Sequence, residues 1–193
     1  EGSETYIPKN YDLAYWGPLT IREALGASRN IPAVSMIRAV GVPAFYTLLR
    51  KAGFDHMTFG PDHYGHGLAL GTGGASLMQL ARVYAAIARG GMLLPVFIGE
   101  DRRGNPITAG GSARLMTDKT ARYITGILSD REIRRRASPG SRNFLDFPFE
   151  VAVKTGTSKD YRDAWTQGFT TRYVVGVWAG NFSGKPMKRV SGS

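Results

Sequence analysis

The chain reads Phe149-Glu150-Val151-Ala152-Val153-Lys154-Thr155-Gly156-Thr157-Ser158 where an apolar run passes into small and hydroxylated residues. The β-branched and aromatic residues of the first half favour a strand. The glycine allows another backbone to lie against the strand edge, because no side chain stands in the way. The lysine supplies positive charge and the hydroxyls donate hydrogen bonds, a combination suited to a carboxylate. By itself the triplet at 154–156 is a weak signal, since an ordinary strand end with a glycine turn has the same composition.

Two more strands are predicted downstream, at 164–170 and 173–180, from their content of Trp, Phe, Val and Tyr. Only Thr171 and Arg172 separate them, which predicts an antiparallel hairpin. One further strand is predicted upstream, over 92–98, followed by a turn at 103–106. Helical patterns occupy most of the remaining upstream sequence. Helices first and antiparallel strands last predict an α+β domain.

The predicted helices lie between a capping residue or proline and a glycine or turn. They run from Thr20 to a turn at 28–30, from Pro32 to Gly41, over 42–51, from Ser76 to Gly90, and from Thr117 to Leu128. Glu23 and Gln79 follow Thr20 and Ser76 by three residues, so both helix starts carry a capping box. The glycine-rich stretch at 65–74 is predicted to be a loop.

The composition describes a folded domain with a basic balance. The 193 residues are 42% hydrophobic, and the formal net charge is +10. Such a charge suits nucleic acid, an anionic membrane surface or an anionic polymer without choosing among them. No aromatics are interleaved with the arginines at 131–136, so no nucleic-acid partner is expected, and a solvated surface is the simpler interpretation. The absence of cysteine excludes disulfides and thiol catalysis.

A second motif strengthens the first. A Lys-Thr-Gly triplet is one of three motifs of the penicillin-recognising serine enzymes, and the others are Ser-x-x-Lys and Ser-x-Asn. Ser28-Arg29-Asn30 fits Ser-x-Asn and precedes the triplet in the expected chain order. Ser141-Arg142-Asn143 also fits, but it lies directly before the predicted strand, which leaves no domain between the two motifs. Because a helix cannot run smoothly through Pro32, Ser28 is predicted at a helix end that faces a cleft.

Longer stretches carry a family resemblance. They are Tyr6-Ile7-Pro8-Lys9-Asn10-Tyr11-Asp12, residues 17–25, residues 28–34, Gly67-Leu68-Ala69-Leu70-Gly71, the Lys154 motif, and Arg162-Asp163-Ala164-Trp165. Together they resemble the transpeptidase domain of class A penicillin-binding proteins, from about Tyr6 to Asn181 and with the motifs in family order. The last stretch most resembles the 1C subtype of that family.

The resemblance implies a fold and an activity. The fold is the α+β fold of serine β-lactamases and penicillin-binding transpeptidases, an antiparallel sheet with flanking helices. The activity is that of a serine DD-transpeptidase, which cross-links peptidoglycan stem peptides ending in D-Ala–D-Ala through an acyl-enzyme that β-lactam antibiotics trap. No cofactor is expected. The resemblance also implies a parent protein in the bacterial cell envelope, anchored by an N-terminal membrane helix and carrying a glycosyltransferase.

The same resemblance assigns roles to individual residues. Ser28 is expected to relay a proton to the leaving amine, and Asn30 to bond the substrate amide and the catalytic lysine. Lys154 is expected to set a local field that favours the deprotonated base. The substrate-binding residues are expected to hold the substrate carboxylate and peptide along the strand edge; they are Thr155, Gly156, Thr157 and Ser158.

One family motif is not found in the chain. None of its serines has a lysine three positions on: Ser35 is followed by Arg38 and Ser76 by Gln79, for example. Because the family places its nucleophile motif before the Ser28 segment, the nucleophile is expected upstream of Glu1, and a closing helix beyond Ser193. Residues 1–193 are therefore interpreted as a partial, inactive transpeptidase domain that needs the upstream segment as its partner for stability.

Two alternatives stay open from the sequence. A DD-carboxypeptidase or serine β-lactamase would use the same motifs with water in place of the amine acceptor. A non-catalytic module that binds cell-wall polymer through its basic surface would keep the fold without the chemistry. A metal site is not expected, because His56, His63 and His66 fit no zinc spacing. Trp165 and Trp178 are interpreted as sheet packing; Tyr161 and Arg162 line the cleft or lie in a surface loop.

Overall fold

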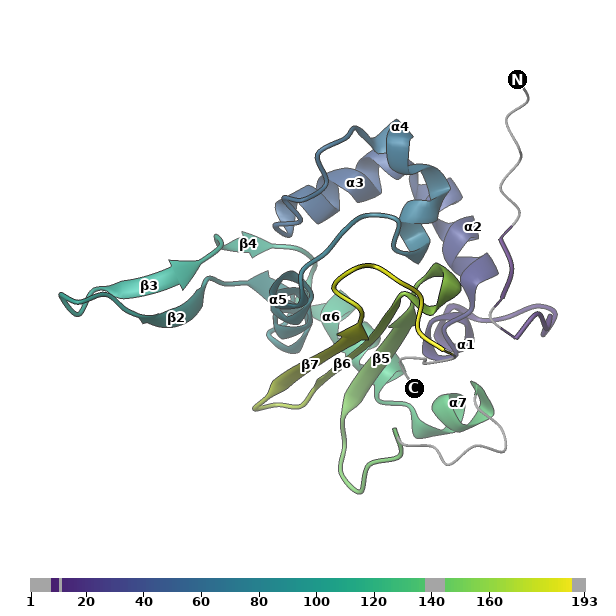
Figure 1. Ribbon diagram of the computed structural model, residues 1–193. Coiled ribbons are helices and arrows are strands. Elements are labelled where there is room, and N and C mark those ends of the chain that lie inside the picture. Colours follow the sequence, from purple (N-terminus) through teal and green to yellow (C-terminus); the bar gives the residue numbers. More distant parts are fainter. Residues whose placement is uncertain (1–7, 11, 138–144, 189–193) are drawn as a thin grey trace.

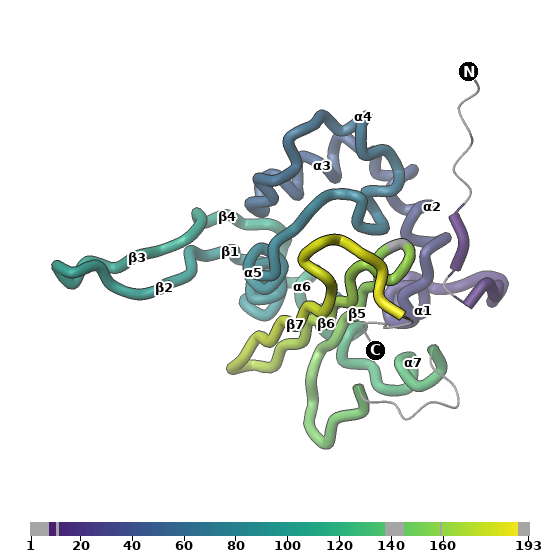
Figure 2. The backbone as a smooth tube through the Cα atoms, viewed as in Figure 1, coloured from purple at the N-terminus to yellow at the C-terminus, as the bar shows by residue number. Residues whose placement is uncertain are grey.

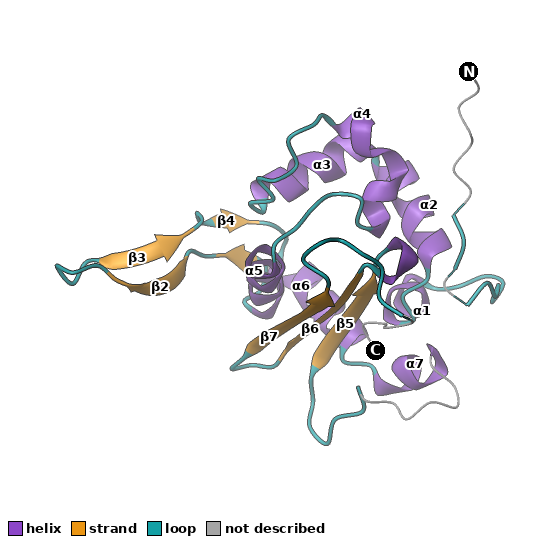
Figure 3. Cartoon of the chain, viewed as in Figure 1, coloured by secondary structure: helices purple, strands orange, loops and turns teal. Residues whose placement is uncertain are grey.

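The computed structural model describes residues 8–10, 12–137 and 145–188 of the chain. Helices make up most of the first half, and the main sheet comes last (Figure 3), as the sequence predicts. The helical elements are α1 (Ile21–Gly26), α2 (Asn30–Val40), α3 (Val42–Lys51), α4 (Pro61–Tyr64), the 3-10 helix η1 (Gly65–Leu70), α5 (Leu77–Ala88), α6 (Asp118–Leu128), α7 (Arg131–Ala137) and the 3-10 turn η2 (Lys159–Tyr161).

The main sheet has three antiparallel strands in the order β5-β6-β7, which are β5 (Ala152–Thr157), β6 (Asp163–Phe169) and β7 (Val174–Gly180). Two small ladders lie apart from it. One pairs β1 (Met92–Leu93) with β4 (Ala113–Arg114), and the other pairs β2 (Val96–Glu100) with β3 (Pro106–Ala109). The β2–β3 hairpin projects away from the rest of the molecule (Figure 1).

Two clusters of buried side chains form the core. The first joins α2 and α3 to η1 around Ile37, Met57 and Leu68. The second lies between α5, α6 and the sheet, where Ile87 and Leu128 pack against Phe169 of β6. Helices α5 and α6 therefore cover one face of the sheet. On the opposite face, Val175 and Val177 of β7 are 59% and 54% exposed.

Capping chemistry sets the helix starts. Both predicted capping boxes form: Thr20 and Ser76 each accept from the backbone three residues on, and Glu23 and Gln79 return the contact. Thr117 accepts from the backbone N–H of Thr120 at the start of α6. These local signals place the helix starts where the sequence predicts them.

Three local predictions need correction. The single strand predicted over 92–98 is two strands, because Leu94 and Pro95 interrupt it and proline has no N–H for a ladder. The loop predicted over 65–74 contains η1, which ends at Gly71 in the left-handed conformation (φ 94°). The arginines at 131–136 lie in α7, where Arg131, Arg135 and Arg136 are exposed as predicted but Arg134 is buried and donates to the Leu128 carbonyl.

Within the described residues, no single helix has the length and apolar character to cross a bilayer. Helices α2 and α3 reach the required length and composition only together, as a pair bent by 96°.

Candidate active site

Strand β5 presents the Lys154 motif along its length. In the register with β6, Lys154 lies opposite Gln167, and Gly156 lies opposite Trp165. Gln167 is buried, while Lys154 is half-buried and its amine reaches the turn that follows helix α1. The apolar half of the predicted strand anchors it, since Val151, Ala152 and Val153 are all buried. The strand thus fixes the lysine in place at its polar end.

Ser28 lies on the turn between α1 and α2. Its N–H donates to the Leu25 carbonyl at 3.1 Å, and the Arg29 N–H donates to the Ala24 carbonyl at 2.9 Å. These two bonds are the pair that closes a helix in a Schellman motif, and they give Ser28 the left-handed position, with φ 55°. The Ser28 side chain is exposed, while the Arg29 side chain turns inward.

The two motifs are 126 positions apart in the sequence but in contact in the fold. The Lys154 ammonium donates a short hydrogen bond to the Ser28 hydroxyl, and a second one to the Thr155 carbonyl at 2.7 Å. A hydroxyl whose oxygen accepts from an ammonium has its own proton free to donate elsewhere. The arrangement can therefore pass a proton through Ser28 while Lys154 holds the oxygen.

Burial governs the charge of Lys154. The surrounding protein atoms penalise its ammonium and lower the pKa of Lys154 to about 8, from 10.5. The lysine is thus charged at neutral pH but close to the pH at which it loses its proton. With a pKa in this range, a lysine can act both as a positive charge and as a group that exchanges a proton.

We expect the Lys154 amine to titrate near pH 8 in the folded protein. Because the unfolded chain binds more protons between about pH 8 and 10.5, the stability of the folded state rises with pH across that window. Below pH 8 the full cost of burying the ammonium is present. Side-chain ¹⁵N NMR of labelled lysines, assigned with a Lys154→Arg variant, measures the midpoint. A midpoint near 10.5 would contradict a desolvated amine.

Asn30 is held by the segment before α1. Its side-chain amide donates to the Lys9 carbonyl at 2.9 Å. The buried Asn10 side chain accepts from the backbone N–H groups of Asn30 and Ile31, at 3.1 and 3.3 Å, and so caps α2 from outside the helix. Asn10 was missed as a site residue by sequence reasoning, although it lies in the Tyr6–Asp12 stretch that carries the family resemblance.

The substrate-binding residues predicted on β5 do not share one environment. Thr155, Gly156 and Thr157 follow Lys154 on the strand and are all half-buried. The Ser158 hydroxyl instead contacts the Asp163 carboxylate at 2.9 Å and accepts from the Asp163 N–H at 2.8 Å. Asp163 also accepts from the Trp178 indole at 2.9 Å. In the structure Ser158 therefore closes the turn between β5 and β6.

The other residues singled out from the sequence are the histidines considered for a metal site, the two tryptophans of the sheet, and Tyr161. Among the described residues, no group of three His, Asp or Glu side chains is arranged to hold a metal ion. His63 stacks on Phe59, with 4.2 Å between ring centroids. Trp165 and Trp178 form a cross-strand pair in the sheet, with 6.2 Å between ring centroids. The segment after β7 returns to η2, where the Met187 N–H donates to the Tyr161 carbonyl at 2.9 Å (Figure 2).

Comparison with known proteins gives one consistent family. Residues 2–185 match the family model described as the penicillin binding protein transpeptidase domain. Penicillin-binding protein 1C of Escherichia coli is 35% identical over 182 residues, which cover 94% of this chain and 22% of that protein. Penicillin-binding protein 1A of Aquifex aeolicus is 33% identical over 196 residues, covering 98% of this chain and 26% of that protein. The chain thus spans about a quarter of the length of these curated relatives.

Solved structures share the fold. The crystal structure of penicillin-binding protein 1A from Haemophilus influenzae matches with a TM-score of 0.70 and 24% identity, over 97% of this chain and 34% of that chain. Penicillin-binding protein A from M. tuberculosis, solved as an imipenem acyl-enzyme complex, matches with a TM-score of 0.64 and 21% identity, over 89% and 46%. The α+β fold predicted from the sequence is therefore confirmed.

Proposed function

Because this chain belongs to the penicillin-binding protein transpeptidase domain family, we propose that its parent protein is a serine DD-transpeptidase of peptidoglycan. One observation carries the proposal beyond the family match. Lys154 and Ser28, from two motifs 126 positions apart, are in hydrogen-bond contact on one side of the domain. A hydroxyl that is held by an ammonium is placed to relay a proton, which acyl transfer at a serine can use.

The nucleophile in this proposal is a serine outside residues 1–193, since none of the chain's serines begins a Ser-x-x-Lys motif. Its hydroxyl oxygen attacks the carbonyl of the D-Ala–D-Ala bond, the carbon–nitrogen bond breaks, and Ser28 passes the serine proton to the departing D-alanine. An amine of a second stem peptide then attacks the ester, and the serine regains a proton. Lys154 stabilises the charge that develops near Ser28.

The strand edge recognises the substrate in this proposal. Thr155 and Thr157 donate to the stem-peptide carboxylate, and the backbone of β5 pairs with the extended peptide in the manner of an added strand. Asn30 orients the substrate amide from the α2 side. Ser158 contributes through the turn that it closes with Asp163. A β-lactam occupies the same edge and acylates the same serine.

The longer relatives suggest the setting of the parent protein. Since the chain covers 22% of the E. coli relative, most of such a protein lies outside this domain. We expect that remainder to include a glycosyltransferase domain and an N-terminal membrane helix, which place the transpeptidase on the outer face of the cytoplasmic membrane. Its substrate would then be the nascent cell wall.

The release of D-alanine tests this function directly. The full-length protein, mixed with peptidoglycan precursor whose stems end in D-Ala–D-Ala, is expected to release D-alanine and form cross-linked dimers, and a β-lactam should block both. Release of D-alanine without dimers would instead indicate a carboxypeptidase. Neither product, with an intact fold, would favour a non-catalytic module that binds cell-wall polymer.

A substitution at Gly156 is expected to affect ligand binding without affecting folding. A Cβ added there would lie 3.7 Å from its nearest neighbour, the Trp165 Cβ, so the protein itself has room for alanine. We expect Gly156→Ala to fold normally but to slow β-lactam acylation of the full-length protein by roughly tenfold or more, because the methyl group meets the ligand. Stopped-flow acylation and a melting curve measure the two effects. Wild-type acylation in this variant would remove Gly156 from the binding edge.

A further inference from the structure

Ser28 occupies a backbone position that glycine normally fills. It is the left-handed residue that closes α1, with φ 55°. A side chain in this conformation is unfavourable, so it persists where neighbouring contacts hold it. One of the two backbone bonds that close this turn comes from Arg29, the next residue and the middle member of the Ser-x-Asn motif, whose side chain makes contacts of its own.

Arg29 is anchored on two sides. Its side chain is 6% exposed, and its guanidinium forms an ion pair with Asp12 at 2.7 Å. A second nitrogen donates a short hydrogen bond to the Ala14 carbonyl. The arginine lowers the pKa of the Asp12 carboxyl, chiefly through their hydrogen bond. Burial and two directed contacts fix the Arg29 side chain and with it the backbone beside Ser28.

A tryptophan completes the anchor. The Arg29 guanidinium lies 4.6 Å from the centroid of the Trp16 ring, and the Arg136 guanidinium of α7 lies over the same ring, also at 4.6 Å. The Arg136 guanidinium is itself paired with Glu23 of α1 at 3.2 Å. Each cation gains from the electron-rich ring face, so Trp16 contacts both guanidinium groups.

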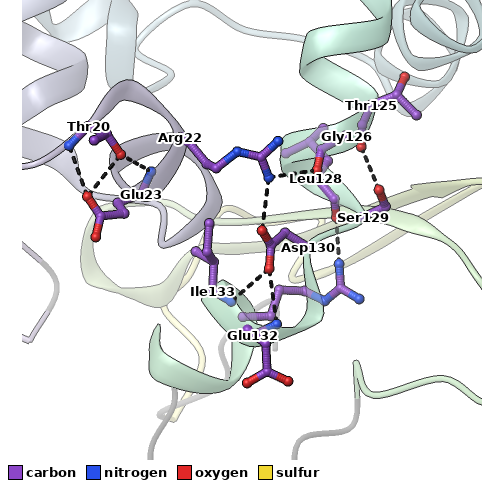
Figure 4. Close-up of polar contacts among 11 residues, drawn as sticks. Thr20, Arg22, Glu23, Thr125, Gly126, Leu128, Ser129, Asp130, Glu132 and Ile133 are labelled. Atoms are coloured by element: carbon purple, nitrogen blue, oxygen red, sulfur yellow. Dashed lines mark hydrogen bonds and ion pairs between the residues drawn. The ribbon is translucent and has the colours of Figure 1, made fainter.

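Helix α7 is held where this contact requires it. A Cβ on Gly26 would lie 2.7 Å from the Ile133 side chain, so the absence of one lets α7 approach α1 closely. Arg22 of α1 pairs with Asp130 at 2.9 Å, and Asp130 accepts from the Ile133 N–H at 3.2 Å at the start of α7 (Figure 4). Arg136 therefore reaches Trp16 from a fixed element.

We propose that Arg29, Trp16 and Arg136 form a guanidinium stack that positions the Ser28 hydroxyl against Lys154. These three are positioning residues: they hold the loop that presents Ser28, and they act on the reaction through it. The inference rests on the proposed function, since it assigns a device for aligning the proton relay of that site. It also explains why a serine can stand at a glycine position.

Four substitutions in the full-length protein test the stack. Arg29→Lys keeps a cation for Asp12 but loses the planar group, and Trp16→Leu removes the ring face. Both are expected to slow β-lactam acylation by between about ten- and a hundredfold, the effect of a small misplacement of a reacting group. Trp16→Phe restores a ring and should stay near the wild-type rate. Arg122→Lys, in an exposed ion pair with Asp118, is the matched control and should be unchanged.

The pH profile separates positioning from folding. Loss of the Ser28 acceptor removes a hydrogen bond to the charged form of Lys154, so the alkaline limb of the acylation profile should move to lower pH in Arg29→Lys and Trp16→Leu. Reduced folding alone would lower the amount of labelled protein and leave that limb in place. Wild-type rates in both variants, or slow rates with an unmoved limb, would overturn the stack. Failure of the wild-type protein to be acylated would instead overturn the proposed function.

Discussion

Replacement of Lys154 by methionine is expected to slow β-lactam acylation of the full-length protein by between about a hundred- and ten-thousandfold. Methionine occupies the space of the lysine's aliphatic chain but removes the ammonium, which donates to the Ser28 hydroxyl and the Thr155 carbonyl. Ser28 would then lose the contact that fixes its oxygen, and the site would lose its positive charge. Single-turnover acylation measured by stopped flow gives the rate.

The matched control for this variant is Lys119→Met, which removes a lysine from the exposed face of α6. It should acylate at the wild-type rate. Because the cost of burying an ammonium disappears in Lys154→Met, that variant should also be at least as stable as the wild type at pH 7. A Lys154→Met protein that is stable and still acylates within threefold of the wild type would remove this lysine from the mechanism.

The largest effect on stability is expected at Gly91. This residue follows α5 with φ 91°, and a Cβ there would lie 2.2 Å from the Met116 carbonyl oxygen, a backbone atom. The Gly91 carbonyl also accepts from the Leu115 N–H at 2.9 Å, so the two segments cannot separate without losing this bond. Gly91→Ala should cost about 1–2 kcal/mol for its backbone conformation and about 1–3 kcal/mol for the clash.

Gly104 provides the comparison, because it has a similar φ of 78° and no atom within 4 Å of an added Cβ. Gly104→Ala should show the conformational cost alone. Protease resistance of the domain over a temperature series, in the full-length protein, measures both variants without relying on activity. Equal losses in the two variants would show that the contact between Gly91 and Met116 is not a constraint.

Local signals predicted much of the fold. The capping boxes at Thr20 and Ser76 set two helix starts, and the short connection at Thr171 and Arg172 joins β6 to β7 as an antiparallel hairpin. These features depend on residues close in sequence. The strand at 92–98 was wrong for a local reason that the sequence did contain, since Pro95 lies inside the predicted range.

Other features depend on contacts between distant segments. The arginines of α7 were interpreted as a solvated surface, and Arg131, Arg135 and Arg136 are exposed. Nothing in their spacing shows that Arg134 would be buried or that Arg136 would lie over Trp16. Ser28 was predicted at a helix end, but its left-handed conformation has no glycine to signal it. The capping of α2 by Asn10 likewise joins residues twenty positions apart. Such contacts appear only once the chain is folded.

The site was predicted in part. The sequence selected Ser28 and Lys154, and the structure places them in hydrogen-bond contact. The assigned roles of these and of the other site residues stay predictions. The Ser158 hydroxyl donates to the Asp163 carboxylate, and the Asn30 amide donates to the Lys9 carbonyl. A contact of either side chain with substrate would have to coexist with these hydrogen bonds or replace them.

The position of the serine that a β-lactam acylates decides whether the nucleophile lies outside residues 1–193. The full-length protein is labelled with a fluorescent penicillin, digested, and mapped by mass spectrometry, with residues 1–193 alone as the comparison. We predict one adduct, on a serine of a Ser-x-x-Lys motif outside residues 1–193, and no labelling of the 193-residue chain. An adduct on Ser28 or another serine of this chain, or no adduct in the full-length protein, would contradict a nucleophile outside residues 1–193.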